Sequence, residues 1–344
     1  MRIAIVSAMA AVALSTSSAG TAQQASPLFS SDEPLHLVIS APINNLMRDR
    51  ANSAPVAGTL VDPAGQTLPI SLAIRSTTRR NADVCDFAPL RVVFTGRPPA
   101  TSPFAGQSKL KLVTHCGSSP GAQQYELLEY AAYRMLNQLT PRSFRVRLAN
   151  IDYRDGNGRP MMTRYGFFIE DLKDVARRNG TKPSHGPERI PANFLNPTDA
   201  ARYALFQHMI ANHDWSMRAG AAGKDCCHNA ELIGALAPGA VTPIPYDFDY
   251  SGYVGAPYAV PPEQMSISSV KQRFYRGYCA HNPQALVVAR QMLAAKPQML
   301  GVLTQTPGLE PRTLQRATSF LNGFFNDIAS DEITSAKVLK RCAA

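Results

Sequence analysis

The stretch FRVRLANIDYRDGNGRPMMTRYGFFIED, residues 144–171, decides the predicted fold. Two strand-like segments, Phe144–Tyr153 and Met161–Ile169, flank Asp155-Gly156-Asn157-Gly158, and this tetrapeptide is a strong hairpin turn signal. The stretch therefore predicts a β-hairpin. The chain changes character after Glu170-Asp171, and we place the boundary between its two halves there.

Upstream of the hairpin, short strand-like segments alternate with turn signals such as Asp62-Pro63-Ala64-Gly65. The predicted strands are Leu35–Ile39, Val56–Val61, Leu68–Ile74, Leu90–Phe94 and Lys109–Val113. One helix is predicted from Ala122 to Leu139, because its apolar residues recur at helical spacing and Thr140-Pro141 stops it. The first half is thus predicted to be a sheet with one inserted helix.

Downstream of the hairpin, the sequence favours helices joined by long loops. Asn196-Pro197 is a capping signal for a helix at 198–211, and further helices are predicted at 283–296, 310–329 and 331–340. The predicted fold is α+β and bilobal, as in protein kinases. Residues 23–171 would form a β-rich N-lobe with one helix, residues 172–344 a mainly helical C-lobe, and a nucleotide would lie in the cleft between them.

The first residues predict a signal peptide. Arg2 precedes an apolar run from Ile3 to Leu14, and small residues follow up to Ala25, so residues 1–22 are expected to be removed on export. The apolar run is shorter than the roughly 20 residues that span a bilayer. We expect a secreted or periplasmic protein without a transmembrane segment after signal removal.

Composition and cysteines narrow the class of protein. Of the residues, 45% are hydrophobic and 17% charged, which is typical of a globular chain. The formal net charge is +10, but the basic residues form no long run, so the sequence favours an acidic or phosphorylated ligand and predicts no nucleic-acid partner. The alternative is a generally basic exported protein whose charge serves no particular ligand. The six cysteines favour disulfides, with Cys85–Cys116 as the preferred pair. A zinc site at Cys226, Cys227 and His228 is the alternative for those residues.

Three motifs of the second half carry residues that phosphoryl transfer requires. They are His213-Asp214-Trp215, Cys227-His228-Asn229 and Asp247-Phe248-Asp249. The reaction needs a carboxylate that orients the attacking hydroxyl and oxygen ligands that hold magnesium against phosphates. The alternation at 247–249 predicts two carboxylates on one side and an aromatic ring in the core. The alternative for Asp214 and Asn229 is that they cap helices or turns.

Around these motifs, over much of Leu35 to about Cys279, the chain resembles the CotH-like (spore coat protein H) family of atypical secreted kinases. The resemblance implies Asp214 as the catalytic aspartate, Asn229 as a metal ligand, and Asp247 with Asp249 as the metal-binding pair. Asn229 lies fifteen positions beyond Asp214, much farther than the few residues that separate the corresponding pair in protein kinases. The family implies ATP as donor, Mg²⁺ or Mn²⁺ as cofactor, and Ser or Thr hydroxyls of exported or envelope proteins as acceptors.

The first half supplies candidates for the other wall of the cleft. Lys111 would contact the phosphates and Glu129 would orient it, with Lys109 and Glu126 as substitutes. Arg75 and Arg79 belong to a loop, residues 75–80, that follows a strand and could bind phosphate oxygens; the alternative is an ordinary solvated turn. Glu170 belongs to the predicted hinge between the lobes, whose backbone would pair with adenine.

The sequence leaves three functions open. The first is an exported phosphotransferase that moves the γ-phosphoryl group of ATP to protein hydroxyls. The second is a non-catalytic, pseudokinase-like binding or scaffold protein of the cell envelope, and the absence of a glycine-rich phosphate loop favours it. The third is a phosphotransferase that acts on a small molecule or glycan. Motifs typical of serine hydrolases, zinc proteases and P-loop NTPases are absent from the sequence.

Overall fold

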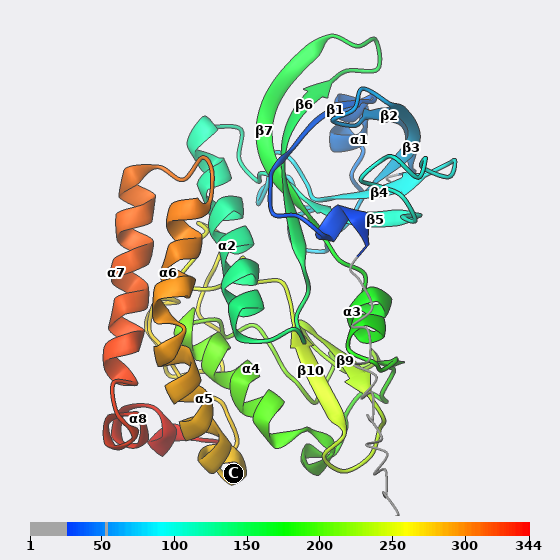
Figure 1. The fold of residues 1–344 in the computed structure, drawn as a ribbon. Helices are drawn as coiled ribbons and strands as arrows, with labels where there is room; N and C mark the ends of the chain where they lie inside the picture. The colour runs from blue at the N-terminus through cyan, green and yellow to red at the C-terminus, as the bar shows by residue number, and fades with distance from the viewer. Residues whose placement is uncertain (1–25, 52–53) are drawn as a thin grey trace, which may run out of the picture.

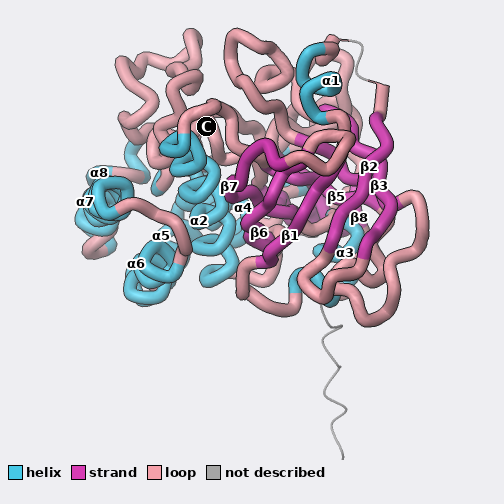
Figure 2. Tube along the Cα trace, turned by 90° about the horizontal axis from the view of Figure 1, so that it is seen from above, coloured by secondary structure: helices cyan, strands magenta, loops and turns pink. Residues whose placement is uncertain are grey.

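The computed structural model describes residues 26–51 and 54–344. The protein is α+β: strands of the first half form a barrel, and helices cover one side of it (Figure 1, Figure 2). The signal peptide predicted over residues 1–22 lies outside the described residues. No helix in the described ranges has the length and hydrophobicity that crossing a membrane requires.

The barrel is built from the strands that the sequence predicted. Their bounds are β1 (Leu35–Ser40), β2 (Val56–Val61), β3 (Thr67–Ile74), β4 (Leu90–Phe94), β5 (Lys109–Val113), β6 (Val146–Arg154) and β7 (Pro160–Ile169). A short helix, α1 (Ile43–Arg48), follows β1. The predicted hairpin is confirmed, because β6 and β7 pair antiparallel around the turn at Asp155.

Strand β1 closes this sheet on itself. It pairs antiparallel with β2 and parallel with β6, where Leu35 lies opposite Ala149 and Ser40 opposite Arg154. The order around the closed barrel is β1-β2-β3-β4-β5-β7-β6. The predicted bilobal protein-kinase-like fold is therefore wrong. The parallel pairing of β1 with β6 joins segments distant in sequence, which local patterns of hydrophobicity do not encode.

Strand β7 separates two hydrophobic cores. Phe168 points into the barrel, where its ring meets Phe104 edge to face at 5.6 Å. Its neighbours Phe167 and Ile169 point outward into a second core, because successive side chains of a strand face opposite sides. The barrel wall thus belongs to both cores.

Helix α2 (Gln123–Leu139) covers the outer face of β7, and its predicted bounds are confirmed within one residue. Buried Tyr133 on α2 packs against Phe167, with 5.7 Å between ring centroids. On its other side α2 packs against α6 (Lys296–Gln305). The helix expected inside the first half is therefore part of the core of the second half.

The second half begins with α3 (Leu172–Arg178) and contains α4 (Pro197–Met209), α5 (Asn282–Ala294), α7 (Pro311–Asp327) and α8 (Asp331–Lys337). Helix α4 is capped as predicted, since the Asn196 side chain accepts a hydrogen bond from the N–H of Asp199 and Pro197 fills the first turn. It packs against α5 and against strand β10 (Val241–Pro245).

A small sheet in the second half was not predicted. It has the order β10-β9-β8, with β8 at Pro183–Ser184 and β9 at Ala230–Gly234. Pro243 and Pro245 hide β10 in the sequence, because proline lowers strand propensity and is tolerated on edge strands such as this one. The antiparallel pair β9 and β10 places Ala230 opposite Pro245. The residues just before β9 and just after β10 are therefore neighbours.

All six cysteines are paired in three disulfides. The predicted bond between Cys85 and Cys116 is confirmed, with 4.7 Å between the Cα atoms. Cys279 pairs with Cys342, and the adjacent Cys226 and Cys227 pair with each other. Oxidised Cys226 and Cys227 are unavailable as thiolate ligands, which argues against the zinc alternative. Three disulfides indicate an oxidising compartment.

Candidate functional site

One pocket gathers most of the predicted site residues. It has a volume of about 150 Å³ and is formed by the loop after β3, the loop between α4 and β9, and the segment after β10. Asp214, Asn229, Asp247 and Asp249 all line it. The remaining lining residues include His228, Tyr250 and the loop from Arg75 to Arg79. Three segments that are distant in sequence therefore meet at one place.

Asp214 and Asn229 are in direct contact in spite of the fifteen positions between them. The Nδ2 atom of Asn229 donates to the Asp214 carbonyl at 2.7 Å and to Oδ2 at 3.0 Å. The backbone N–H of Ser216 donates to the carbonyl of His228 at 2.9 Å, which closes the base of the loop. The elaborated loop thus returns to its start, and its two functional ends meet.

His228 completes the surroundings of Asp214. Its Nε2 atom lies 2.6 Å from Asp214 Oδ1, and the two side chains are 47% and 40% exposed at the mouth of the pocket. The hydrogen bond to Asp214 raises the pKa of His228 above its ordinary value, and burial opposes part of this shift. Asp214 is therefore held from two sides, by an imidazole and by an amide. The sequence indicated His228 as a candidate ligand in the zinc alternative but did not predict this contact.

Asp247 and Asp249 reach the pocket from the segment that follows β10. The ring of Phe248 between them is fully buried against Tyr133 and Phe206, as the alternation predicted. The backbone at Asp247 is left-handed, with φ 63°, and its N–H donates to Tyr133 Oη at 2.8 Å. A tyrosine of α2 thus fixes the position of Asp247.

Asp249 is buried beside a charge from the first half. Its Oδ2 atom lies 3.5 Å from Arg79 Nε and accepts a hydrogen bond from Tyr258 Oη at 3.0 Å. Burial, with the neighbouring Asp247 as the next cause, raises the pKa of Asp249 to about 6. Tyr258 was not predicted as part of the site, since it lies in a loop without a recognisable motif.

Arg79 is one buried cation among several buried carboxylates. Besides Asp249 it faces Glu126 on α2, where the closest nitrogen and oxygen are 4.0 Å apart. Glu129 is also buried and interacts electrostatically with both Asp249 and Arg79, and burial raises its pKa well above the ordinary value. Within the described residues, neither carboxylate oxygen of Glu129 has a hydrogen-bond partner. The cluster therefore lacks positive charge, which protons or a bound cation would supply.

Within the described residues, Lys111 forms no ion pair with Glu129. Its ammonium group sits 5.2 Å from the ring centroid of Tyr246 instead. Burial lowers the pKa of Lys111, and the charge of Arg75 lowers it further, while Glu231 and Asp247 oppose the shift. Arg79, which the sequence assigned to phosphate binding, takes the place facing the carboxylates of α2.

The loop at residues 75–80 presents donors to the same pocket. One guanidinium nitrogen each of Arg75 and Arg79 is buried without a hydrogen-bond partner among the described residues. Within those residues, the backbone N–H groups of Ser76, Thr77 and Thr78 also donate to no protein acceptor. Such groups suit an anion with several oxygens.

Backbone strain concentrates at this pocket. In residues 26–51 and 54–344, four residues other than glycine have positive φ: Ser76, Ala211, Asn229 and Asp247. Three of them line the pocket, and Ser76, with φ 106°, is the most unusual. Unfavourable backbone conformations persist where the surrounding structure enforces them, and they cluster at functional sites.

Glu170 is not among the residues that line this pocket. Its carboxylate is buried, with Oε1 3.0 Å from Arg178 Nε, and its Oε2 accepts from the backbone N–H of Arg145 at 2.9 Å. The backbone N–H of Glu170 donates to the Arg145 carbonyl at 3.0 Å. The N–H expected to pair with adenine is therefore already engaged within the protein.

Metal-binding capacity depends on more than carboxylates here. In the part of the chain that the structure describes, no three His, Cys, Asp or Glu side chains are grouped so that they could hold a metal ion. Magnesium is commonly bound by one or two carboxylates together with substrate phosphates, for which Asp247, Asp249 and the amide oxygen of Asn229 are suitable groups. Comparison with known proteins adds no family assignment, since neither a protein-family model nor a curated protein matches the chain.

Proposed function

We propose that the protein is an exported, metal-dependent phosphotransferase that moves the γ-phosphoryl group of ATP to a hydroxyl group. The observation that supports this most directly is the meeting of Asp214 and Asn229 with Asp247, Asp249 and the loop at 75–80 in one pocket. The resemblance to the CotH-like family supplies the acceptor class, namely Ser or Thr hydroxyls of exported or envelope proteins.

Each group has a role in this proposal. Asp247, Asp249 and Asn229 would hold Mg²⁺ or Mn²⁺, which would neutralise charge on the phosphates when bound. The buried carboxylate of Glu129, which has no hydrogen-bond partner within the described residues and interacts electrostatically with Asp247 and Asp249, fits such a cation. Arg75 and the free N–H groups of the loop would bind phosphate oxygens.

Asp214 would orient the attacking hydroxyl at the mouth of the pocket. A bond forms between the acceptor oxygen and the γ-phosphorus while the bond from that phosphorus to the bridging oxygen breaks and ADP leaves. The hydroxyl proton passes to Asp214, a carboxylate that Asn229 and His228 hold in place. Its 40% exposure leaves room for an acceptor side chain.

The proposal is tested by calorimetric titration of the protein with ATP in the presence of Mg²⁺, Mn²⁺ or EDTA. Transfer of label from ATP to exported proteins is measured in parallel. Asp247→Ala should lose metal-dependent ATP binding and reduce transfer by several orders of magnitude, because metal-dependent charge compensation is worth several kcal/mol. Asp214→Ala should bind ATP normally but fail in transfer. Asp49→Ala removes an exposed carboxylate that does not line the pocket and serves as the control.

Three outcomes distinguish the alternatives. Wild-type protein that binds no ATP with either metal would overturn the proposal and leave a non-catalytic envelope protein. Wild-type transfer by Asp247→Ala would remove the assigned metal site. Phosphorylated small molecules or glycans in place of labelled protein would keep the reaction but change the acceptor class.

A further inference from the structure

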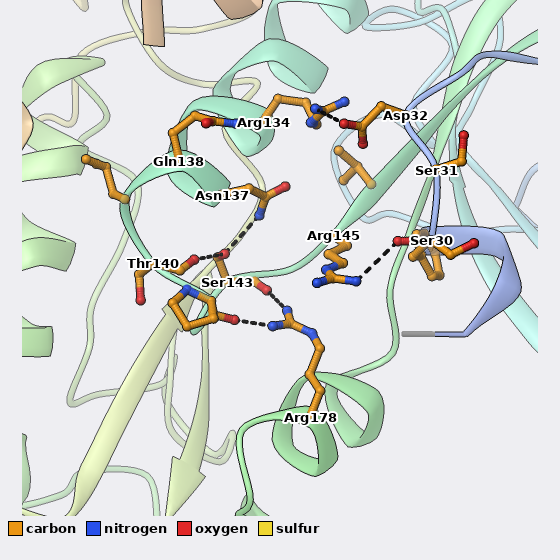
Figure 3. Close-up of a pocket in the computed structure, with 14 residues that line it drawn as sticks. Ser30, Ser31, Asp32, Arg134, Asn137, Gln138, Thr140, Ser143, Arg145 and Arg178 are labelled. Carbon is orange, nitrogen blue, oxygen red and sulfur yellow. Dashed lines mark hydrogen bonds and ion pairs between the residues drawn. The ribbon is translucent and has the colours of Figure 1, made fainter. Parts of the chain in front are cut away.

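A second and larger pocket has a volume of about 570 Å³ (Figure 3). It is formed where the end of α2, the start of β6, α3 and the segment before β1 meet. It shares no lining residue with the pocket around Asp214. We call it the Arg145 pocket. Its volume is in the range of small-molecule sites, roughly 300 to 1,000 Å³.

Three arginines line the Arg145 pocket, and Arg178 among them is fully engaged. Arg178 is buried, forms an ion pair with Glu170, and donates to the carbonyls of Pro141 and Ser143. Glu170 also accepts from the backbone N–H of Arg145. These contacts hold Arg178 in place at the base of the pocket. Substitution of Arg178 would therefore report on folding rather than on ligand binding.

Arg145 is the arginine with donors to spare. Its side chain is half-buried, and the one hydrogen bond that it makes within the described residues is a long contact of 3.4 Å to the Phe29 carbonyl. No carboxylate in residues 26–51 or 54–344 forms an ion pair with it. A guanidinium group has five N–H donors in a planar fork that suits phosphate and carboxylate oxygens. Most of this capacity faces the pocket.

Arg134 stands opposite, held by a partner that a ligand can replace. It pairs with Asp32 at 2.5 Å, and the side chain of Asp32 is 71% exposed. The side chain of Arg134 is 14% exposed, so water screens this pair chiefly from the side of Asp32 and weakens it there. Arg134 also donates to Tyr130 Oη at 2.9 Å, which fixes its direction. An anion in the pocket could therefore bind Arg134 after displacing Asp32.

We propose that the Arg145 pocket binds a small phosphate-bearing molecule through Arg145 and Arg134. A carboxylate has two oxygens, which a single guanidinium satisfies, whereas a phosphate has enough terminal oxygens for both arginines. Asp32 is the one carboxylate among the lining residues, and it competes with the ligand. This site is independent of the proposed phosphotransfer, since it needs neither the metal nor Asp214.

The test is calorimetric titration of the whole mature protein with pyrophosphate in EDTA, which removes any metal ion from the pocket around Asp214. Arg145→Ala should weaken binding by at least about tenfold, because it removes charge-assisted hydrogen bonds. Asp32→Asn should strengthen binding about two- to fivefold, because it removes the competing carboxylate. Arg97→Ala removes the same charge from an exposed position outside the pocket and should leave the affinity unchanged.

The opposite signs of Arg145→Ala and Asp32→Asn separate binding from loss of folding, which could only weaken affinity. Arg75→Ala should leave binding in EDTA unchanged. The proposal is overturned if the wild type binds no pyrophosphate, if Arg145→Ala binds as the wild type does, or if Arg75→Ala alone removes binding. None of these results depends on ATP turnover. Failure of the Arg145 pocket to bind pyrophosphate would therefore not bear on the proposed phosphotransfer, which is tested separately.

Discussion

At the scale of the residue, the buried carboxylate Glu126 makes stability depend on pH. Burial raises its pKa to about 8 from an ordinary value of 4.5, although Arg79 opposes the shift. The nearer partner of Arg79 is Asp249, at 3.5 Å against 4.0 Å for Glu126, so one guanidinium does not compensate both carboxylates. Glu126 is therefore protonated in the folded protein at neutral pH.

Glu126→Gln should consequently change the pH dependence of unfolding. The folded state holds this proton more tightly than the unfolded state does. The contribution of protonated Glu126 to the free energy of unfolding is therefore fully present below about pH 4.5 and is lost as the pH rises through about 8. Between pH 5 and pH 9, the free energy of unfolding of the variant should rise relative to that of wild type by on the order of 2 to 4 kcal/mol. Urea unfolding at both pH values measures this, and a parallel shift at all pH values would contradict it.

The contact of His228 with Asp214 gives a second prediction for single residues. The hydrogen bond to the carboxylate raises the pKa of His228, so Asp214→Asn should lower that pKa toward 6.5. The pair stabilises the fold below about pH 6.5 and loses this contribution as the pH rises through the raised pKa. Titration of the imidazole C–H resonances by NMR follows it, with Asp49→Asn as control. An unchanged His228 resonance would mean that the contact is absent in solution.

At the scale of the element, local patterns in the sequence predicted the strands of the barrel and helices α2 and α4. These elements carry their own signals, such as the turn at Asp155 and the cap at Asn196. Strand β10 was not predicted because two of its residues are prolines. The pairing of β9 with β10, which brings Asn229 beside the segment that contains Asp247, was therefore not predicted either. The motifs of the site could thus be found in the sequence, but their supporting sheet could not.

The disulfide between Cys85 and Cys116 joins the loop after β3 to the segment after β5. The bond closes a loop with a sequence separation of 31, so replacing both cysteines by alanine should cost roughly 3 to 4 kcal/mol in the chain-entropy model. Urea unfolding of the double variant against wild type provides the measurement. Equal stability of the two proteins would show that the bond does not constrain the unfolded chain.

At the scale of the whole molecule, contacts between distant segments decided what the sequence did not predict. Closure of the barrel depends on the pairing of β1 with β6, and assembly of the site depends on three loops from both halves. Arg79 illustrates the difficulty. Its sequence context indicated phosphate binding, whereas its position between Glu126 and Asp249 follows from how α2 packs between the barrel and the helices.

The same packing predicts that the two halves unfold together. Strand β7 contributes Phe168 to the barrel core and Phe167 to the core around α2, so neither core survives without this strand. Phe104 is fully buried inside the barrel, and the single tryptophan, Trp215, belongs to the other core. Trp215 fluorescence can therefore report on damage done at a distance.

Phe104→Ala should destabilise the protein by about 3 to 5 kcal/mol, since it removes a large ring from a packed core. If the molecule is one cooperative unit, the urea midpoint measured by Trp215 fluorescence falls as far as the midpoint measured by far-ultraviolet circular dichroism. Phe324→Ala, in the core that contains Trp215, provides the comparison and should shift both midpoints by a similar amount. A barrel that unfolds by itself would instead leave the fluorescence midpoint of Phe104→Ala at its wild-type value, and the shared strand β7 would then not couple the two cores.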